Sequence, residues 1–315
     1  MSQPASATPP GDRGQSDSAA PARLPAEPRP AGQPGSIEPA PGEPRPSIVP
    51  PGLDATIVLI RHGESEWVAR GLFQGQGDSP LSEMGRRQAV LAAERLAHAH
   101  RAPALPVPIG PPLAVVHSPL SRAAETAAVI ADALSAAAAF DAPIPRLADS
   151  AFAEIGQGEW EGVAATTVAD RWKDLLAQWR LDPLTAWAPG GESLPEVDDR
   201  VRMGLSRLLG RLADDRPAGA VERSQVLGYA ELPSTEPWAI LVGHDGSFKV
   251  ALLALLDIPL SRFWSFPFAL CGLTVVELRG GRVRLRLHNA TDHLAPLETE
   301  LARAKDAARS RSGAL

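Results

Sequence analysis

The chain has 315 residues, with 31 Lys and Arg against 37 Asp and Glu, so its formal net charge is −6. An acidic chain is a poor partner for nucleic acid, and a single Cys excludes both an internal disulfide and a thiolate zinc site. No apolar run approaches the length of a membrane span, and the N-terminal residues lack the apolar core of a secretory signal. We therefore expect a soluble, cytoplasmic protein.

Proline is distributed unevenly and separates the ends of the chain from its body. Residues 1–51 contain 14 of the 32 prolines and no aromatic residue. Such a segment buries too little apolar surface to offset the entropy lost on ordering. We predict a Pro-rich disordered tail over 1–52, an ordered domain over 53–297 and a flexible tail over 298–315. The alternative for the first segment is a proline-rich docking arm.

Strand-like and helix-like patterns alternate through the body. In chain order we predict a strand at 55–60, a helix at 82–98, a strand at 112–117, helices at 120–134, 163–180 and 193–212, a strand at 238–242, a helix at 247–256 and strands at 272–279 and 282–288. Ser82 can cap the first helix, and Ser193 with Glu196 forms a capping box for the fourth. Gly280 and Gly281 predict a hairpin between the last two strands.

This alternation favours an α/β fold: a three-layer sandwich whose mainly parallel central sheet is covered by helices on both faces. The stretch at 214–237 is interpreted as a long surface loop.

Charged side chains follow the predicted strands, at the edge where such sheets bind ligands. Arg61 and His62 stand at the end of the first strand, and Arg122 follows the second. His244 comes shortly after the strand at 238–242. One histidine at a strand end is more often a packing residue than a catalyst. Two histidines and two arginines at one edge predict a functional site.

Short motifs accompany these residues in a fixed order. They are Arg-His-Gly-Glu-Ser at 61–65, Gln-Gly at 74–75, Ser-Pro-Leu-Ser-Arg-Ala at 118–123, Glu154 with Gly-Glu-Trp-Glu-Gly at 158–162, Gly-Gly-Glu-Ser at 190–193 and Gly-His at 243–244. With this set the chain resembles the histidine phosphatase superfamily, also called the phosphoglycerate mutase-like family, over about 55–297. The resemblance implies a phosphoglycerate mutase-like fold and a phosphomonoester hydrolase that needs no metal and no cofactor.

The resemblance also implies a role for each charged side chain. His62 would be the nucleophile that forms a phosphohistidine intermediate. Arg61, Arg122 and His244 would bind the phosphoryl oxygens and stabilise their charge. The N-terminus of the helix after His244 would offer further amide dipoles to the anion.

Glu154 would act as the general acid and base, with the nearby Glu159 and Glu161 as alternatives. The substrate-binding set implied by the resemblance is Arg61, Ser65, Gln74, Gly75, Arg122, His244 and Asp245.

Two positions depart from the family pattern. Val68 stands where the family commonly has an Asn whose side chain reaches the phosphate. Asp245 follows the second histidine, where the family often has a small residue, and places an anion beside an anion site. We expect Asp245 to turn outward or to contact a neutral part of the substrate.

Helical residues at 163–189 are expected to cap the pocket with Trp172, Trp179 and Trp187. These aromatic side chains either favour an apolar or planar leaving group or simply pack in a core. Trp67 and Trp160 are interpreted as packing residues.

Two other functions stay open. Phosphoglycerate mutases carry basic residues after the catalytic Glu, whereas residues 155–168 contain no Lys or Arg, which favours hydrolysis over mutase-type transfer. A non-catalytic phosphate-binding regulatory module is the second alternative, and only Val68 supports it. The expected partner is a small-molecule phosphomonoester, with no nucleic acid and no membrane; the oligomeric state stays open.

Overall fold

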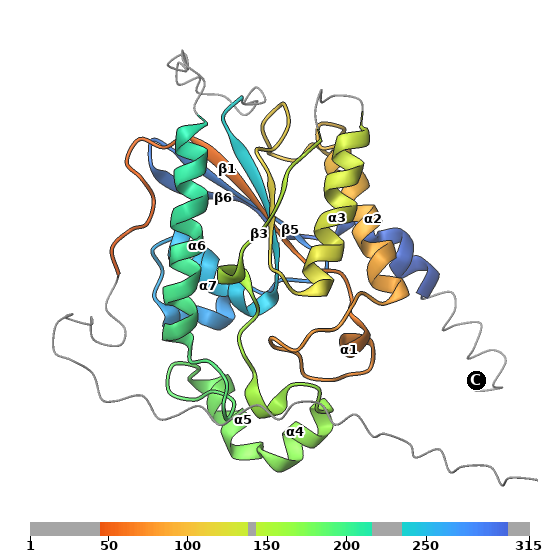
Figure 1. Ribbon diagram of the computed structural model, residues 1–315, viewed down its shortest axis with the longest axis vertical. Helices are drawn as coiled ribbons and strands as arrows, with labels where there is room; N and C mark the ends of the chain where they lie inside the picture. The colour runs from red at the N-terminus through yellow and green to blue at the C-terminus, as the bar shows by residue number, and fades with distance from the viewer. Residues whose placement is uncertain (1–44, 138–142, 216–234, 302–315) are drawn as a thin grey trace, which may run out of the picture. The chain divides into compact units, whose positions relative to one another are not determined.

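A six-stranded sheet forms the centre of the residues that the computed structural model describes, 45–137, 143–215 and 235–301 (Figure 1). Its strands are β1 Ala55–Arg61, β2 Val115–His117, β3 Arg146–Ala148, β4 Trp238–Gly243, β5 Leu273–Arg279 and β6 Arg282–Ala290, in the spatial order β3-β2-β4-β1-β5-β6. β1 and β2 both pair with β4 in parallel, as β2 does with β3. β5 runs antiparallel to β1 and β6. The parallel strands therefore end at one edge.

Helices cover both faces of this sheet. α2 Glu83–Ala97 and α3 Ser121–Ala136 pack on each other and lie against one face (Figure 1). α6 Leu194–Asp214 and α7 Asp245–Leu255 form the corresponding pair on the other face. The predicted α/β fold and its three layers are confirmed.

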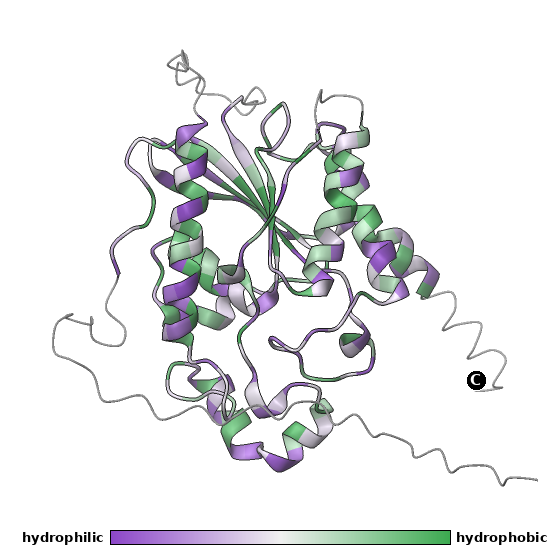
Figure 2. Cartoon of the chain, viewed as in Figure 1, coloured by the Kyte–Doolittle hydropathy of each residue, from purple (hydrophilic) through white to green (hydrophobic). Residues whose placement is uncertain are grey.

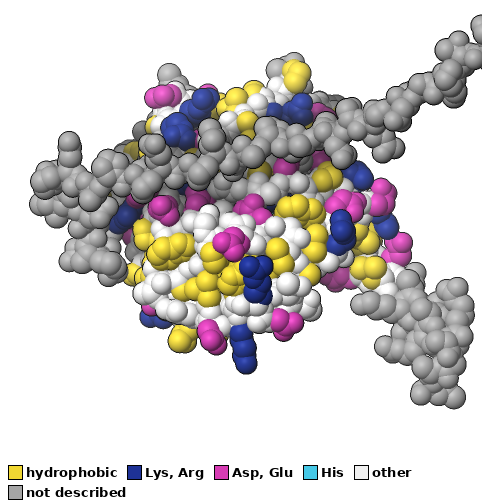
Figure 3. Space-filling model, turned by 60° about the horizontal axis from the view of Figure 1, so that its bottom comes forward, with side chains coloured by type: hydrophobic (Ala, Val, Ile, Leu, Met, Phe, Trp, Pro, Cys, Tyr) yellow, Lys and Arg dark blue, Asp and Glu magenta, His cyan; other side chains and the backbone are white. Residues whose placement is uncertain are grey.

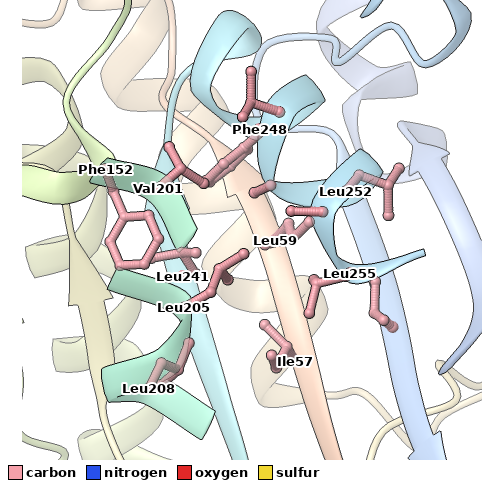
Figure 4. Packing of buried hydrophobic residues seen from close by; sticks show 14 of the residues in the cluster. Ile57, Leu59, Phe152, Val201, Leu205, Leu208, Leu241, Phe248, Leu252 and Leu255 are labelled. Carbon is pink, nitrogen blue, oxygen red and sulfur yellow. The ribbon is translucent and has the colours of Figure 1, made fainter. Parts of the chain in front are cut away.

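The sequence of β1 explains why two cores form. Side chains of a strand alternate between the two faces of a sheet. Ile57 and Leu59 join the core beneath α6 and α7, which Figure 4 shows closely packed. Val58 and Ile60 join the core beneath α2 and α3. A strand buried on both faces is mostly apolar, and Figure 2 shows hydrophobic colour concentrated in the middle of the central strands.

Shorter elements connect these layers. The α-helices among them are α1 Glu66–Ala69, α4 Ala165–Arg171 and α5 Lys173–Leu181. Short 3₁₀ segments are η1 Ser150–Phe152, η2 Gly158–Trp160, η3 Leu260–Ser265, which is kinked at Arg262, and η4 Asp292–Leu294. Within the described ranges, no helix is both long and apolar enough to cross a membrane.

Two predicted elements differ clearly from the structure, and one strand was not predicted. The strand predicted at 112–117 is reduced to Val115–His117. The helix predicted at 163–180 is divided at Trp172, whose φ of −120° and ψ of 37° lie outside the helical region. β3 was not predicted, because Arg146–Ala148 is too short to show an alternating pattern. The capping box and the final hairpin are confirmed. Most of the loop predicted at 214–237 lies outside the described residues.

The last part of the predicted N-terminal tail, residues 45–52, lies against the body. Val49 is buried, and Arg45 forms an ion pair with Asp198 on α6 at 3.1 Å. Residues 1–44 and 302–315 lie outside the described residues, so the proposed division into domain and tails stays a prediction.

Candidate active site

The two histidines of the predicted set lie together at the carboxyl edge of the sheet. His62 follows β1 and His244 follows β4, and these strands are parallel neighbours. The His62 amide donates to the Gly243 carbonyl oxygen at 2.9 Å, and the imidazole centroids are 5.0 Å apart. Both side chains are buried. The topology therefore unites residues that are distant in sequence.

His62 binds the protein through one ring nitrogen, and the other has no hydrogen-bond partner in the part of the chain that the structure describes. Its Nδ1 lies 2.6 Å from the carbonyl oxygen of Gly63. A carbonyl oxygen only accepts, so the neutral ring has its hydrogen on Nδ1 and its lone pair on Nε2. Burial, then the charges of Arg122 and Arg61, lower the pKa of His62 well below its ordinary value. The ring is therefore neutral near pH 7 and has a nucleophilic nitrogen.

Arg122 is a completely buried cation in the first turn of α3. Its Nη2 donates to the Gly75 carbonyl oxygen at 2.7 Å, and its Nη1 donates to that of Gly77 at 3.0 Å. Burial lowers the pKa of Arg122 to about 10, and the charge of Glu154 is the main opposing influence. The guanidinium is still charged at pH 7, and two carbonyl groups fix its position.

Arg61 is the last residue of β1 and rests against the segment that follows η3. Its Nη1 donates to the carbonyl oxygen of Phe268 at 2.6 Å. Its own carbonyl oxygen accepts from the Cys271 amide at 3.0 Å. The segment between these two residues therefore supports both the side chain and the backbone of Arg61.

Three buried nitrogens around His62 have no hydrogen-bond partner among the described residues: Nε of Arg61, Nε of Arg122 and Nδ1 of His244. The Ser118 hydroxyl lies 2.8 Å from Nε2 of His244 and has no other acceptor within the described ranges. Its hydrogen therefore points at Nε2, and the hydrogen of the His244 ring sits on Nδ1. Buried donors normally have partners, so these three unpaired donors indicate an anion site.

Glu154 occupies the N-terminus of α7, directly beside His244. Its Oε1 accepts from the amides of Ile155 and Ser247 at 2.9 and 3.0 Å, and its Oε2 accepts from Gly246 at 3.2 Å. A Cβ on Gly246 would lie 2.6 Å from Oε1, so this approach needs glycine. The Glu154 carboxylate already binds two amides of this helix N-terminus, and the expectation that its dipoles favour the substrate anion stays a prediction.

Glu159 and Glu161, the two alternative general acids, have different surroundings from Glu154. Glu159 is exposed on η2. The Oε1 of Glu161 accepts from the amides of Gln76 and Gln157, both at 2.9 Å, and so links two loops. Only Glu154 of the three bonds to the helix that His244 caps.

Ser65, Gln74 and Gly75 form one wall beside Arg122. The Ser65 hydroxyl donates to Gln74 Oε1 at 2.8 Å and accepts from the amide of Val68 at 3.2 Å, which caps α1. Gly75 has a φ of +130°, and a Cβ there would lie 2.3 Å from Oε1 of Glu161. Glycine thus allows the backbone turn whose carbonyl holds Arg122.

Asp245, assigned to the substrate-binding set, directs both carboxylate oxygens to protein groups. Oδ2 lies 2.5 Å from Nζ of Lys249, and Oδ1 accepts from the Phe268 amide at 3.1 Å. The expectation that Asp245 turns outward or contacts a neutral part of the substrate stays a prediction.

Arg200 on α6 was missed by the sequence analysis. Its guanidinium donates to both carboxylate oxygens of Glu192 and to the carbonyl oxygens of Ala151, Ala153 and Glu154, at 2.8 to 3.0 Å. Arg200 thereby fixes the loop that presents Glu154. The signal was weak, because an arginine on a helix usually faces solvent. Glu192 was noted only as part of a motif.

Comparisons with known proteins agree on the family. A model described as the histidine phosphatase superfamily (branch 1) matches residues 57–291. The chain is 28% identical over 248 residues to a protein of Hydrogenobacter thermophilus named phosphoserine phosphatase 1, covering 78% of this chain and 96% of that protein. It is 31% identical over 225 residues to a glucosyl-3-phosphoglycerate phosphatase of Mycolicibacterium vanbaalenii, covering 71% and 84%.

Solved structures show the same fold. The chain matches a structure titled mycobacterial hydrolase 1 with a TM-score of 0.60 and 26% identity, covering 76% of this chain and all of the other. It also matches a mycobacterial glucosyl-3-phosphoglycerate phosphatase in complex with VO3, with a TM-score of 0.58 and 26% identity, covering 75% and 99%.

Proposed function

The chain belongs to the histidine phosphatase superfamily, and from this premise we propose that it hydrolyses phosphomonoesters through a phosphohistidine formed on His62. The observation that carries the proposal is the state of this ring: Nδ1 donates to Gly63, so the lone pair of Nε2 is free in a buried, cationic site. In the transition state for phosphoryl transfer, negative charge is spread over three equatorial oxygens, and positioned cations lower the barrier.

The proposed reaction has two displacements. In the first, Nε2 of His62 attacks phosphorus, the ester P–O bond breaks, and the leaving alkoxide takes a proton from Glu154. In the second, the Glu154 carboxylate removes a proton from water, the hydroxide attacks phosphorus, and the P–N electron pair returns to His62. Arg61, Arg122 and His244 bind the oxygens throughout, which their three unpaired nitrogens support.

Arg61 and Arg122 supply the positive charge that other phosphatases obtain from a metal ion, and His244 adds a neutral N–H donor. Two guanidinium groups and an imidazole N–H are sufficient donors for the three oxygens. We therefore expect turnover to persist in EDTA. A loss of turnover that Mg²⁺ restores would contradict this form of the proposal.

The relatives suggest substrates to assay first. Phosphoserine and glucosyl-3-phosphoglycerate are the substrates named for the two relatives compared above. The absence of Lys and Arg from residues 155–168 supports a hydrolase over a mutase, because mutases hold a second anionic group. 3-Phosphoglycerate should accordingly be hydrolysed slowly or not at all, without isomerisation.

The decisive experiment traps the intermediate. Rapid mixing with ³²P-labelled substrate and alkaline quench should give an acid-labile, base-stable phosphoprotein in the wild type. His62→Ala should abolish the label and reduce turnover by roughly 10⁴-fold or more. His117→Ala is the matched control, because His117 also ends a strand and its Nδ1 also bonds to the next carbonyl, at 2.8 Å. If His62→Ala is labelled as strongly as the wild type, His62 is not the nucleophile.

A further inference from the structure

We propose that Asp245 and Lys249 are positioning residues that hold the Arg61 guanidinium through the backbone of Phe268. The inference rests on the proposed function, because it concerns how that phosphate site is preorganised. It gives a role to the acidic side chain that departs from the family pattern beside His244.

The contacts form one continuous chain. Nζ of Lys249 lies 2.5 Å from Oδ2 of Asp245. Oδ1 of the same carboxylate accepts from the Phe268 amide at 3.1 Å, and the Phe268 carbonyl oxygen accepts from Nη1 of Arg61 at 2.6 Å. Asp245 and Arg61 thus grip the same residue, one through its N–H and the other through its C=O.

Lys249 is placed so that it orients Asp245 instead of binding substrate. Its side chain is only 7% exposed, and Nζ lies 4.8 Å from the ring centroid of Trp264 and 5.3 Å from that of Phe263. Aromatic faces and one carboxylate stabilise the buried ammonium. Because the ammonium takes Oδ2, the other oxygen is left to accept from Phe268.

The Phe268 ring packs against Phe248 of α7, with centroids 5.5 Å apart, whereas hydrogen bonds position the backbone of this segment. The Ala269 amide donates to Oδ1 of Asn289 on β6 at 2.6 Å, and the Cys271 amide donates to the Arg61 backbone. Asp245 supplies the hydrogen bond from α7, which begins directly after His244, to the Phe268 backbone. It therefore sets Arg61 relative to the second phosphate-binding histidine.

A small displacement of the Arg61 guanidinium should lower the reaction rate strongly. A misplacement of about 1 Å in a positioned catalytic group can cost on the order of 10²-fold in rate. Nη1 of Arg61 donates to the Phe268 carbonyl oxygen, and this bond fixes the guanidinium only if Phe268 itself is fixed. Removing the acceptor at Asp245 should therefore weaken phosphate binding without removing any group that touches phosphate.

Two double variants isolate this acceptor. Asp245→Asn with Lys249→Met removes both charges but retains an oxygen that can accept from Phe268. Asp245→Ala with Lys249→Met removes the same charges and also the oxygen. The two variants have equal net charge, and neither leaves a buried lysine unpaired. Thermal unfolding of both shows how much of each protein is folded at the assay temperature.

The readouts are the Kd of inorganic phosphate by calorimetry and the KM and kcat for p-nitrophenyl phosphate. We expect the Ala form to bind phosphate about tenfold more weakly than the Asn form, which is about 1.4 kcal/mol, and to show a higher KM. When Arg61→Met is added to each double variant, this difference should vanish, because Asp245 acts through Arg61.

Equal phosphate affinity of the Asn and Ala forms would overturn the inference. A tenfold difference that persists beside Arg61→Met would also overturn it, since the effect would then bypass Arg61. Phosphate affinity is measured without turnover. The two proposals can therefore fail separately. If the variants give the expected phosphate affinities but the wild type forms no phosphohistidine, the proposed function is refuted and the positioning role of Asp245 stands.

Discussion

The phosphate site and the aromatic cluster at the α4–α5 end of the protein are held together by opposite kinds of interaction. We define the aromatic cluster as Trp160, Trp172, Trp179 and Trp264, which come from η2, the α4–α5 segment and η3. The Trp179 ring meets Trp160 at 6.1 Å and Trp264 at 4.8 Å between centroids, both edge to face. The contacts between these apolar rings stabilise the fold, although only Trp160 is fully buried and Trp264 is 41% exposed. In the site, burial instead encloses cations and unpaired donors.

This difference distinguishes buried residues that serve function, which are charged or lack hydrogen-bond partners, from those that stabilise the fold by packing. Arg61 and Arg122 each lower the pKa of His62, as does burial, so the site contains groups that disfavour one another's charge. A folded chain tolerates such an arrangement only where other regions stabilise it. The α4–α5 end is one of these regions. Figure 3 looks onto it and shows apolar side chains gathered between scattered charged ones.

The largest expected effect comes from the site. Glu154→Gln retains the shape of the side chain but removes its ability to transfer a proton. Turnover of alkyl phosphates should fall by about 10²- to 10⁴-fold. Phosphorylation by p-nitrophenyl phosphate should fall much less, because its leaving group needs little protonation. Rapid-quench kinetics on both substrates measures the first step, and the variant should accumulate phosphohistidine because dephosphorylation lacks its base.

Glu159→Gln is the control for this prediction, because Glu159 is exposed nearby. It should leave both substrates unaffected. Equal losses for the two leaving groups in the Glu154 variant would contradict the assignment of the acid and favour Glu161, whose carboxylate lies beside Gln76 and Gln157.

Much of the site was predictable because many of its residues directly follow strands that end at the same edge of the sheet. His62 and His244 follow apolar runs that can only be buried strands, and parallel neighbours end at one edge. What could not be predicted depends on contacts between distant loops. Arg200 donates to the Glu154 backbone, and the Glu154 carboxylate accepts from the N-terminus of α7. Each of these bonds joins residues that are tens of positions apart, so no local sequence pattern predicts them.

The fold shows the same division. The strand at β1 and the capped helix α2 were predicted almost to the residue, because periodicity and a serine cap are local signals. β3 and the break at Trp172 were not, because tertiary packing decides them. Trp172 and Trp179 were expected to cap the pocket or to pack, and both rings lie against Trp160, as packing requires.

The second prediction tests the aromatic cluster. Trp179→Ala removes the edge-to-face contacts with Trp160 and Trp264, so the free energy of unfolding should fall by about 2–3 kcal/mol. Trp187→Ala is the matched control, because this ring is 42% exposed, and it should cost less than about 0.5 kcal/mol. Urea unfolding gives both values. A variant of Trp179 that keeps its stability but loses phosphorylation rate would place this residue in the site instead.

The smallest expected effect is a pH dependence that the site imposes on the whole fold. The pKa of His62 and that of His244 are both lowered well below 6.5, in each case first by burial and then by neighbouring positive or ionisable groups. The unfolded chain takes up these protons near pH 6.5, whereas the folded chain does not. The stability that depends on neutral rings is therefore complete above pH 6.5 and declines as the pH falls below it.

Each histidine can contribute a slope of up to about 1.4 kcal/mol per pH unit in this window. Urea unfolding of the wild type and of His62→Asn between pH 5 and 7 isolates the contribution of one ring, because carboxylates contribute equally to both. The variant should lose stability less steeply on acidification. His98→Asn, at an exposed position, should retain the wild-type slope. If His62→Asn also retains that slope, the folded chain protonates His62 as readily as the unfolded chain, and its ring could not serve as a neutral nucleophile below pH 6.5.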